Sequence, residues 1–401
     1  MGGEAIKSLQ IFEEMLSRGI QVHQITHERV EKEMSRHAGS ASVSYVRDLA
    51  WHHLFWRSVV LRPLLGLHFM REAALMAERL ARDNPDSLVH YTGPVSPVLP
   101  HYPVAGASVI IGPINGNIHY PPALAAREPL AYKLRRVLHP LAQRWQRTFF
   151  SGKQRADILL VAGGQRTRSS LSQAGCHESR MVTTLDSGIP ARLAKLERVP
   201  HTGRNMRFVH NGRLVVHKGV DLAIMAVARA RLPVELDIIG RGPVLDDLKQ
   251  LAAKLGVAAR VHFKDWIADH DAVAPTLQQY RGFVFPSLAE ANGIVVQEAM
   301  MLGLPTICLN WGGPSLLINP ECGILVDAGS EDAIVAGLAD AMDRLAGDGE
   351  LAERLASNGR QRALDLGFSW PDLVDQWLGV YGRARPERAT AAPLTAPRPV
   401  A

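Results

Sequence analysis

The feature of this sequence that most constrains its fold is a strand, a loop and a helix in immediate succession, in FVFPSLAEANGIVVQEAMMLGLPTI at positions 283–307. The apolar run 282–286 predicts a buried parallel strand. After a loop that contains Gly293, a helix is expected over about 294–302, ended by Gly303. Because parallel strands need helical crossovers that cover the sheet, this segment predicts an α/β domain.

The same alternation recurs along most of the chain, in two series with helical segments between the strands. The first series has expected strands at 22–26, 87–91, 108–111, 158–161 and 181–184. The second series has expected strands at 207–211, 235–239, 260–263, 282–285, 306–309 and 323–326. A length of 401 residues fits two such domains. The predicted fold class is therefore α/β, with two parallel-sheet domains.

A stretch of low apolar content at 197–205 predicts the boundary between the domains. The first domain is expected over 1–198 and the second over 205–368. A helix expected over 369–384 follows, and we expect it to pack back on the first domain. Residues 385–401 are rich in Pro, Ala and Arg and are predicted to be disordered.

The opening of the chain predicts a glycine loop, an amphipathic helix and a strand. These elements are the second half of a strand–loop–helix–strand unit. In a doubly wound sheet the first strand is central, so its absence would leave two unpaired edges inside a core. We therefore expect an additional first strand, encoded upstream of Met1.

Composition limits the cellular setting. The three cysteines lie far apart, which predicts a reducing compartment and no zinc site. We find no signal-peptide pattern and no apolar run long enough to span a bilayer. The expected location is therefore the cytoplasm, and no nucleic-acid partner is expected.

Two segments in the first half, 41–83 and 130–150, mix apolar and aromatic residues with arginine and are interpreted as helices. Each is expected to carry an apolar stripe with basic flanks. One interpretation is a helix that faces the core while its arginines cover apolar surface with their stems. The other is peripheral contact with an anionic membrane, at the inner membrane face. Composition leaves both open.

Two carboxylates flank the start of the helix expected at 294–302. Glu290 lies in the loop at the carboxyl end of the strand, and Glu298 lies a little over one turn into the helix. Between them the helix N-terminus presents backbone N–H groups that suit a phosphate. One carboxylate can accept hydroxyls of a sugar and the other those of a ribose. This layout predicts a nucleotide-sugar site, and the alternative is two solvated charges beside an ordinary turn.

Two cations follow the first strand of the second series, in NGRLVVHKG at 211–219. Arg213 and Lys218 stand at the carboxyl end of that strand, a position that suits a pyrophosphate. Cations aimed at a departing diphosphate would stabilise the transition state of a transfer reaction. The alternative is a pair of ordinary surface cations.

The next two strands end in further candidate loops. Gly240, in IIGRGP, predicts a tight turn that lets backbone approach a ligand. The segment resembles a dinucleotide fingerprint whose third glycine is replaced by Leu245, which disfavours a nicotinamide site. In FKDWIADHD, Trp266 or Ile267 is placed to flank a nucleobase.

Asp269 and Asp271 form an Asp-x-Asp pair at the end of the same loop. Such a pair can hold a metal-bound diphosphate. We interpret Asp269 instead as the N-cap of a following helix. No metal site is therefore predicted.

From Arg207 to Tyr381 the sequence resembles the glycosyltransferases of family 4, which have the GT-B fold. The resemblance rests on the ordered succession of NGRLVVHKG, IIGRGP, FKDWI, the 283–307 stretch and GILVD. The first half matches more loosely, through GGEAIKSLQ, SLVHY, GPINGNIHYPP, ADILLV and DSGIP. The resemblance implies two Rossmann-like domains facing a cleft, with the nucleotide-sugar donor in the C-terminal domain and the acceptor in the N-terminal domain. It also implies retention of anomeric configuration without a metal or another cofactor.

The resemblance implies a role for each matching residue. Arg213 and Lys218 would bind the diphosphate, and Glu290 would contact the donor sugar, which makes these three the expected catalytic residues. Glu298 would hold the ribose. The remaining implied contacts are backbone amides of the loop and helix start (Asn292, Gly293 and Ile294) and a glycine loop near the phosphates and acceptor (Gly2 and Gly3).

The sequence departs from the family pattern at two places. The acidic loop usually reads Glu-Gly-Phe-Gly, and here it reads EANG, which alters the contacts around the sugar. Where the family often has a histidine near the reacting centre, the segment GPINGN places Asn115, and His119 lies four residues later. Asn115 can contact the donor sugar but cannot act as a general base. A front-face transfer, in which the leaving phosphate takes the acceptor proton, is therefore favoured.

These expectations together predict a retaining glycosyltransferase of the hexosyltransferase type. It would move a sugar from a nucleotide-diphosphate sugar to a glycan or lipid-linked acceptor, in the synthesis of a surface polysaccharide or glycoconjugate. The alternatives are a non-catalytic GT-B-like binding or scaffold protein and a GT-B relative such as a sugar-nucleotide epimerase or a phosphorylase.

Overall fold

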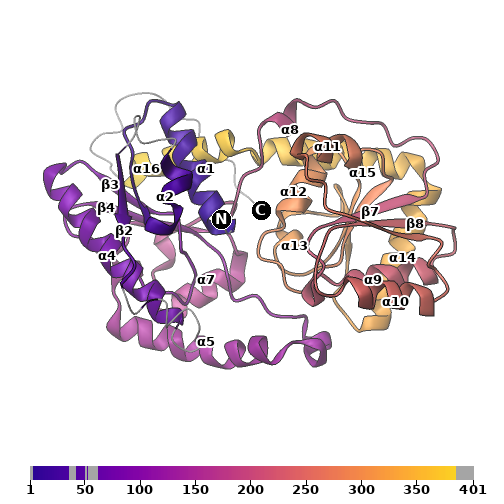
Figure 1. Cartoon of the computed structure of the whole chain (residues 1–401), viewed down its shortest axis with the longest axis horizontal. Helices are drawn as coiled ribbons and strands as arrows, with labels where there is room; N and C mark the ends of the chain where they lie inside the picture. The colour runs from indigo at the N-terminus through magenta and orange to yellow at the C-terminus, as the bar shows by residue number, and fades with distance from the viewer. Residues whose placement is uncertain (1–2, 36–41, 50–51, 53–61, 385–401) are drawn as a thin grey trace. The chain divides into compact units, whose positions relative to one another are not determined.

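The computed structural model describes residues 3–35, 42–49, 52 and 62–384. They form two compact units (Figure 1). The first unit comprises the described residues up to 117, together with 135–187 and 370–384, and the second comprises Ile118–Leu134 and Gly188–Ser369. Residues 118–134, placed in the first domain from the sequence, thus belong to the second unit, because Tyr120 and Leu124 are buried in its core.

The second unit is built on a six-stranded parallel sheet with the order β12-β11-β10-β7-β8-β9. Its strands lie within one residue of the predicted positions: β7 (Arg207–Asn211), β8 (Glu235–Ile239), β9 (Val261–Lys264), β10 (Gly282–Phe285), β11 (Thr306–Leu309) and β12 (Ile324–Val326). The chain builds β7, β8 and β9 outward in one direction and then returns to add β10 on the other side of β7. The order therefore reverses between β7 and β10, and such a switch point opens a crevice at the carboxyl ends of the strands.

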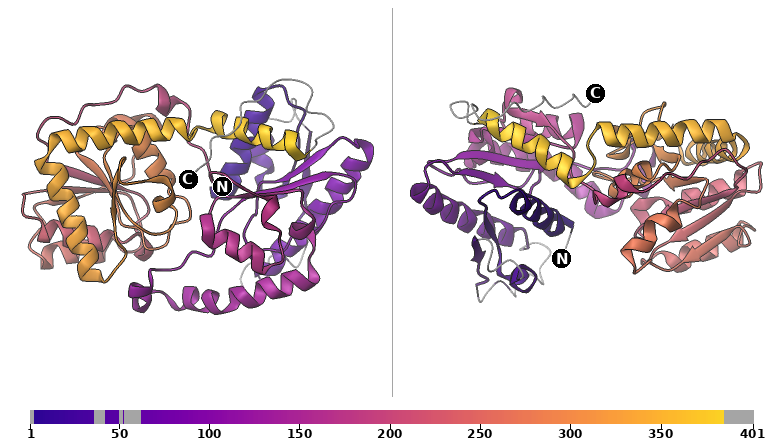
Figure 2. Two further views of the ribbon diagram at one scale, coloured as in Figure 1. Left: turned by 180° about the vertical axis from the view of Figure 1, so that it is seen from behind. Right: turned by 90° about the horizontal axis from the view of Figure 1, so that it is seen from above.

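Helices cover both faces of this sheet (Figures 1 and 2). One face carries α9 (Val220–Arg229), α10 (Leu245–Lys254) and α14 (Glu331–Gly347), and the other carries α8 (Arg192–Lys195), α11 (His270–Leu277), α12 (Ile294–Met301) and α15 (Gly349–Asp365). The short α13 (Pro314–Leu317) and 3-10 helices η3 (Pro122–Arg127) and η5 (Val216–Lys218) lie in loops. The largest apolar core lies between the sheet and α9 and α14, because alternate residues of β8, Leu236 and Ile238, point to that side.

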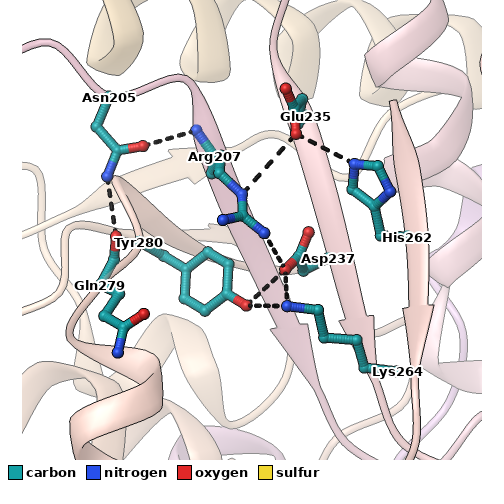
Figure 3. Close-up of polar contacts among 8 residues, drawn as sticks. All are labelled: Asn205, Arg207, Glu235, Asp237, His262, Lys264, Gln279 and Tyr280. Atoms are coloured by element: carbon teal, nitrogen blue, oxygen red, sulfur yellow. Dashed lines mark hydrogen bonds and ion pairs between the residues drawn. The ribbon is translucent and has the colours of Figure 1, made fainter. Parts of the chain in front are cut away.

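Asp237, between those two core residues, points to the opposite face and is fully buried there in a polar cluster (Figure 3). Its Oδ2 atom lies 2.8 Å from Arg207 Nη2 and 2.6 Å from Lys264 Nζ, and accepts a 2.6 Å hydrogen bond from the Tyr280 hydroxyl. Burial raises the pKa of Asp237, but the bonds from Lys264 and Tyr280 and the charge of Arg207 outweigh it, so the net pKa lies below its usual value. The cluster joins β7, β8 and β9 on this face of the sheet.

The first unit has a four-stranded parallel sheet with the order β3-β4-β5-β6, made of β3 (Leu88–Tyr91), β4 (Ser108–Ile114), β5 (Ile158–Val161) and β6 (Met181–Thr183). A separate parallel pair joins β1 (His23–His27) to β2 (Ser42–Val46). The helix predicted from residue 41 onward was wrong over β2. The sequence of this strand, SVSYV, contains valine and tyrosine, which favour strands. The expected additional first strand stays a prediction.

The helices of the first unit are α1 (Gly3–Ser17), α2 (Glu31–Met34), α4 (Arg62–Asp83), α6 (Gly152–Arg155), α7 (Gly164–Gln173), α16 (Trp370–Ala384) and most of α5 (Leu130–Phe149). The last helix, α16, packs on this unit although it follows the second unit in sequence. Trp377 is fully buried and donates a 2.8 Å hydrogen bond to Thr184 Oγ1, and the Tyr381 hydroxyl lies 2.5 Å from His90 Nδ1. Residues 385–401, expected to be disordered, lie outside the described residues. In the part of the chain that the structure describes, no helix is long and apolar enough to cross a bilayer.

Candidate functional site

The candidate site lies in the second unit, where the loops after β7 and β10 meet at the switch point of the sheet. Lys218 follows β7 and Glu290 follows β10. The ammonium of Lys218 pairs with Glu290 Oε2, and it also lies 4.9 Å above the centroid of the Phe285 ring. The two side chains are only 18% and 16% exposed. The structure therefore brings together the cation and the carboxylate that the sequence predicted for one site.

Backbone contacts hold the two loops against each other. The Leu288 amide donates a 2.8 Å hydrogen bond to the carbonyl of His217, and the Ser287 hydroxyl donates a 3.1 Å bond to the same oxygen. Gly219 has a φ of 65°, and a Cβ at this position would collide with the carbonyl oxygen of Pro286. Only glycine fits this approach, so Gly219 fixes the position of the neighbouring Lys218.

The EANG loop is anchored on both sides. The Asn292 side chain is buried and donates a 3.0 Å hydrogen bond to Gln297 Oε1 of the following helix. The Gly313 amide donates a 2.9 Å bond to the Glu290 carbonyl, and a Cβ on Gly312 would lie 2.7 Å from that oxygen. Sequence reasoning missed this glycine pair, although the run WGGP after the β11 strand was the available signal. Asn292 thus stands where the family usually has phenylalanine, and its side-chain amide is paired.

The N-terminus of α12 opens beside Glu290. Gly293 is its N-cap with a φ of 90°, and its carbonyl accepts the first helical hydrogen bonds, from Val296 at 2.8 Å and from the next residue at 3.1 Å. The amides of Ile294 and Val295 precede these bonds, so they lie at the free end of the helix. Helix-end amides and the helix dipole together suit a phosphate.

Glu298 lies one turn further along α12 and is partly buried. Burial raises the pKa of its carboxyl to about 7, against a smaller lowering by the charge of Arg192. Among the described residues no hydrogen bond or ion pair to this carboxylate is found. A half-buried carboxylate of this kind can accept hydroxyls from a ligand, as expected for a ribose.

The loop after β8 packs against the loop after β7. Gly240 has a φ of 149°, and a Cβ there would collide with the Gly212 carbonyl oxygen. Gly242 approaches the Leu214 carbonyl oxygen equally closely. Gly240 therefore lies against the backbone of Gly212, whereas the sequence predicted a close approach to a ligand. It sets the course of the loop that carries Arg213, whose side chain is exposed.

The loop after β9 holds the residues predicted to flank a nucleobase. Trp266 is 47% exposed and its amide donates a 2.6 Å hydrogen bond to Asp265 Oδ1, while Ile267 is half-buried. Asp265 also pairs with Arg241, which fixes the turn. The Trp266 indole is therefore presented at the carboxyl edge of the sheet, where it can stack on a ring.

The Asp-x-Asp pair follows this loop. Asp269 is the N-cap of α11, and its side chain accepts a 2.9 Å hydrogen bond from the Asp271 amide. Asp271 itself pairs with Arg192. The N-cap interpretation is therefore confirmed. Within residues 3–35, 42–49, 52 and 62–384, no cluster of three or more His, Cys, Asp or Glu side chains is arranged to hold a metal ion.

The segment 118–134 runs past the site within the second unit. Trp311 Nε1 donates a 2.8 Å hydrogen bond to the His119 carbonyl, and Arg127 pairs with Asp221 at the start of α9. The Tyr132 ring lies 6.4 Å from the ring of His217, which is in the Lys218 loop. Burial and the charge of Lys218 lower the pKa of His217. Sequence reasoning missed Tyr132 and His217, because nothing local links them.

The other predicted residues lie in the first unit. Asn115 comes directly after β4, and its Oδ1 atom accepts a 2.8 Å hydrogen bond from Arg166 of α7. Arg166 Nε also donates a 2.9 Å bond to the Gly116 carbonyl, so it fixes this loop. Arg166 was not foreseen from the sequence. Gly3 is the first residue of α1, and Gly2 lies outside the described residues.

Two curated glycosyltransferases each match part of this chain. The lipopolysaccharide core biosynthesis glycosyltransferase LpsE of Rhizobium meliloti is 35% identical over 169 residues, which are 42% of this chain and 47% of that protein. The GDP-mannose-dependent alpha-(1-6)-phosphatidylinositol monomannoside mannosyltransferase of Mycobacterium tuberculosis is 33% identical over 184 residues, which are 43% of this chain and 46% of that protein. The chain thus spans about half the length of the curated relatives it matches.

Solved structures resemble the whole chain. Anabaena HepE in complex with UDP aligns with a TM-score of 0.61 and 17% identity, over 95% of this chain and 96% of that one. Sucrose-phosphate synthase of Thermosynechococcus elongatus aligns with a TM-score of 0.63 and 18% identity, over 95% and 93%. These likenesses confirm the predicted GT-B class of α/β fold. Residues 196–362, which carry Lys218, Glu290 and Glu298, match the family described as Glycosyl transferases group 1.

Proposed function

We propose that this protein is a retaining glycosyltransferase that moves a sugar from a nucleotide-diphosphate sugar to a glycan or lipid-linked acceptor, in polysaccharide or glycoconjugate synthesis. The observation that carries the proposal is the Lys218–Glu290 pair beside the N-terminus of α12, at the switch point of the sheet. The match of this region to group 1 glycosyl transferases supports it, as do relatives named for lipopolysaccharide core and mannoside synthesis.

Each group around the pair has a role in binding the donor. The amides of Ile294 and Val295 would bind phosphate oxygens, with Lys218 and the exposed Arg213 adding positive charge. Glu290 would accept a hydroxyl of the donor sugar. Glu298 would accept the ribose hydroxyls, and Trp266 would stack on the base.

The transfer itself needs charge stabilisation more than a protein base. The acceptor oxygen attacks the anomeric carbon on the face from which the diphosphate departs. The bond from that carbon to the phosphate oxygen breaks, and this oxygen takes the acceptor proton. The negative charge that grows on the diphosphate is stabilised by Lys218 and the helix-end amides, which are already in position. We propose that neither a metal nor another cofactor takes part.

A thermal-shift panel of UDP-, GDP- and ADP-sugars tests donor binding. A ligand present at about 100 times its Kd stabilises a protein by ~2.7 kcal/mol, which is easily measured as a rise in Tm. We expect one base class to raise the Tm of the wild type and to do so much less in Lys218→Ala. The matched control is Lys249→Ala, which removes an exposed lysine from α10.

Product analysis then separates a transferase from a non-catalytic donor-binding protein. The enzyme should release the nucleoside diphosphate from its donor, slowly with water and faster with an acceptor. Binding without release would favour the scaffold alternative. An absent thermal shift across the whole panel would contradict the proposed site.

We propose that the protein works in the cytoplasm, peripherally on the inner membrane face. A lipid-linked acceptor would be presented to the enzyme at this surface. The absence of a bilayer-spanning helix among the described residues is compatible with such a peripheral contact.

A further inference from the structure

Helix α5 (Leu130–Phe149) has its polar side inward and its apolar side outward. Within the first unit, its buried side chains are Gln143 and Gln146. Its apolar side chains are between 47% and 67% exposed, and we call them the outer face: Val137, Leu138, Leu141, Trp145 and Phe149. The helix lies at the edge of the first unit in Figure 1 and in the left view of Figure 2. This is the reverse of the usual pattern, in which the apolar stripe faces the core.

The inward side is fixed by specific hydrogen bonds. Gln143 donates to the Ser170 hydroxyl of α7, and Gln146 donates to the Val98 carbonyl. The buried Lys153 ammonium donates a 3.2 Å hydrogen bond to Gln146 Oε1. A rotation of α5 that buried the outer face would break all three bonds and leave buried polar groups unpaired. The outward position of the apolar residues is thus imposed by the packing.

The outer face is one continuous surface. Leu138, Leu141, Trp145 and Phe149 follow one another at spacings of three or four, and Val137 lies four residues before Leu141, so all five lie along one side of the helix. The Trp145 ring lies 5.9 Å from that of Phe149 and 4.8 Å from that of Phe150. Exposed apolar surfaces of this kind mark sites of contact with a membrane, another protein or a ligand.

Helix α4 shows that the arrangement is particular to α5. Both segments were open to a core or a membrane interpretation from the sequence. In α4 the residues Met70, Ala74 and Ala77 are buried in the core of the first unit. Its described part therefore faces the core, and α5 alone of the two keeps an apolar side outside.

The charge of α5 indicates what covers the outer face. Residues 135–149 contain no Asp or Glu and four exposed arginines, Arg135, Arg136, Arg144 and Arg147. A second copy of the same helix would bring like charges together, which is unfavourable. An anionic lipid surface offers an apolar phase and negative phosphates at the same depth.

We propose that the outer face of α5 docks on an anionic lipid bilayer. Val137, Leu138, Leu141 and Phe149 enter the boundary between headgroups and acyl chains, and the Trp145 indole lies at the headgroup level. The flanking arginines bind lipid phosphates. The inference specifies the membrane contact of the proposed function and does not depend on donor binding.

Vesicle flotation of the full chain tests this surface. We expect the wild type to float with vesicles of phosphatidylcholine and phosphatidylglycerol, far less with phosphatidylcholine alone, and to lose part of its binding in high salt. The double variant Val137→Gln/Leu141→Gln should reduce partitioning into the vesicles about tenfold or more, because it removes apolar surface that the bilayer would bury. Glutamine is a good helix former, so the helix should persist.

Two controls keep the test specific. Leu364→Gln changes an exposed leucine on α15, away from the outer face, and should float like the wild type. Arg144→Gln/Arg147→Gln should weaken binding to anionic vesicles while leaving the weak binding to neutral vesicles unchanged. Circular dichroism and Tm should match the wild type for every variant.

Three results would overturn the inference. The wild type could fail to float with anionic vesicles, or the Val137→Gln/Leu141→Gln variant could float as well as the wild type. Light scattering could instead show a dimer that this variant dissociates, without vesicle binding, which would assign the face to a second copy. The donor thermal shift, measured on the same samples, shows separately whether the proposed transferase site holds.

Discussion

The ammonium of Lys218 pairs with the carboxylate of Glu290, although the two residues are 72 positions apart in the chain. The pair forms because β7 and β10 are neighbours in the sheet and both loops leave from the same edge. The salt bridge is therefore a direct consequence of the strand order. It places one positive and one negative group beside the start of α12, as the proposed donor site requires.

Lys218→Ala and Glu290→Ala should each lower kcat about a hundredfold or more, which is typical for the loss of one aimed charge-stabilising group. In the proposed mechanism, the lysine change removes charge that stabilises the departing diphosphate, and the glutamate change removes a contact to the sugar. Steady-state kinetics with the donor found in the thermal-shift panel measure the effect. Lys249→Ala is the matched control, and wild-type kcat in either site variant would refute these roles.

Glu298→Ala should mainly raise KM for the donor, because ribose contacts are made equally in the ground state and the transition state. The wild type should bind donor about tenfold more tightly at about pH 8 than at about pH 6, because the ionised carboxylate accepts hydroxyls. Its pKa is raised to about 7, so this change falls within that interval. Glu298→Gln should show no such pH dependence in calorimetric titrations.

Ionisation of the Glu298 carboxyl should lower the stability of the folded protein, although it favours donor binding. Because the pKa of Glu298 is raised from 4.5 to about 7 in the folded state, its contribution is complete below about pH 4.5 and is lost as the pH rises through about 7. Glu298→Gln stays neutral and should exceed the wild type at about pH 8 by ~1–2 kcal/mol, after allowance for partial exposure. Equal urea midpoints for both proteins at that pH would speak against a buried, unpaired carboxylate.

Gly219→Ala should lower the free energy of unfolding by about 3 kcal/mol, because a left-handed residue and a collision with Pro286 combine. Gly256→Ala is the matched control. Gly256 has a φ of 70° and nothing within 4 Å of its added Cβ, so only the backbone term applies. That term costs about 1 kcal/mol. Urea unfolding of both variants measures the difference, and equal losses would mean that the Pro286 contact is absent.

Asp237→Asn should destabilise the second unit by about 2 kcal/mol, because Arg207 and Lys264 lose a buried partner but are themselves partly exposed. The pKa of Asp237 lies below 3.8, so its stabilising contribution is present above about pH 3.8 and is lost as the pH falls further. The gap between wild type and variant should therefore narrow on acidification. Asp340→Asn, in an exposed pair with Arg231, should resemble the wild type at all pH values. A gap that stays constant from neutral to acid pH would contradict the role of this cluster.

The sequence alone determined most of the second unit. Its strands are short apolar runs closed by glycine or polar turns, and the signals for the helix after Gly293 and for the Asp269 N-cap lie within a few residues. Local signals of this kind are written along the chain. Parallel strands then share one edge, so the placement of Lys218 and Glu290 in neighbouring loops followed as well.

Only the tertiary structure decided what depends on distant partners. It moved residues 118–134 to the second unit, placed Gly312 and Gly313 under the Glu290 loop, and paired Asn115 with Arg166. It also buried Met70, Ala74 and Ala77 of α4 and exposed the outer face of α5, in two segments of similar composition. The spacing of apolar residues in a sequence shows that a helix has an apolar side and which residues form it. Which side faces the core depends on the neighbours that pack against the helix, and in α5 the buried hydrogen bonds of Gln143 and Gln146 determine it.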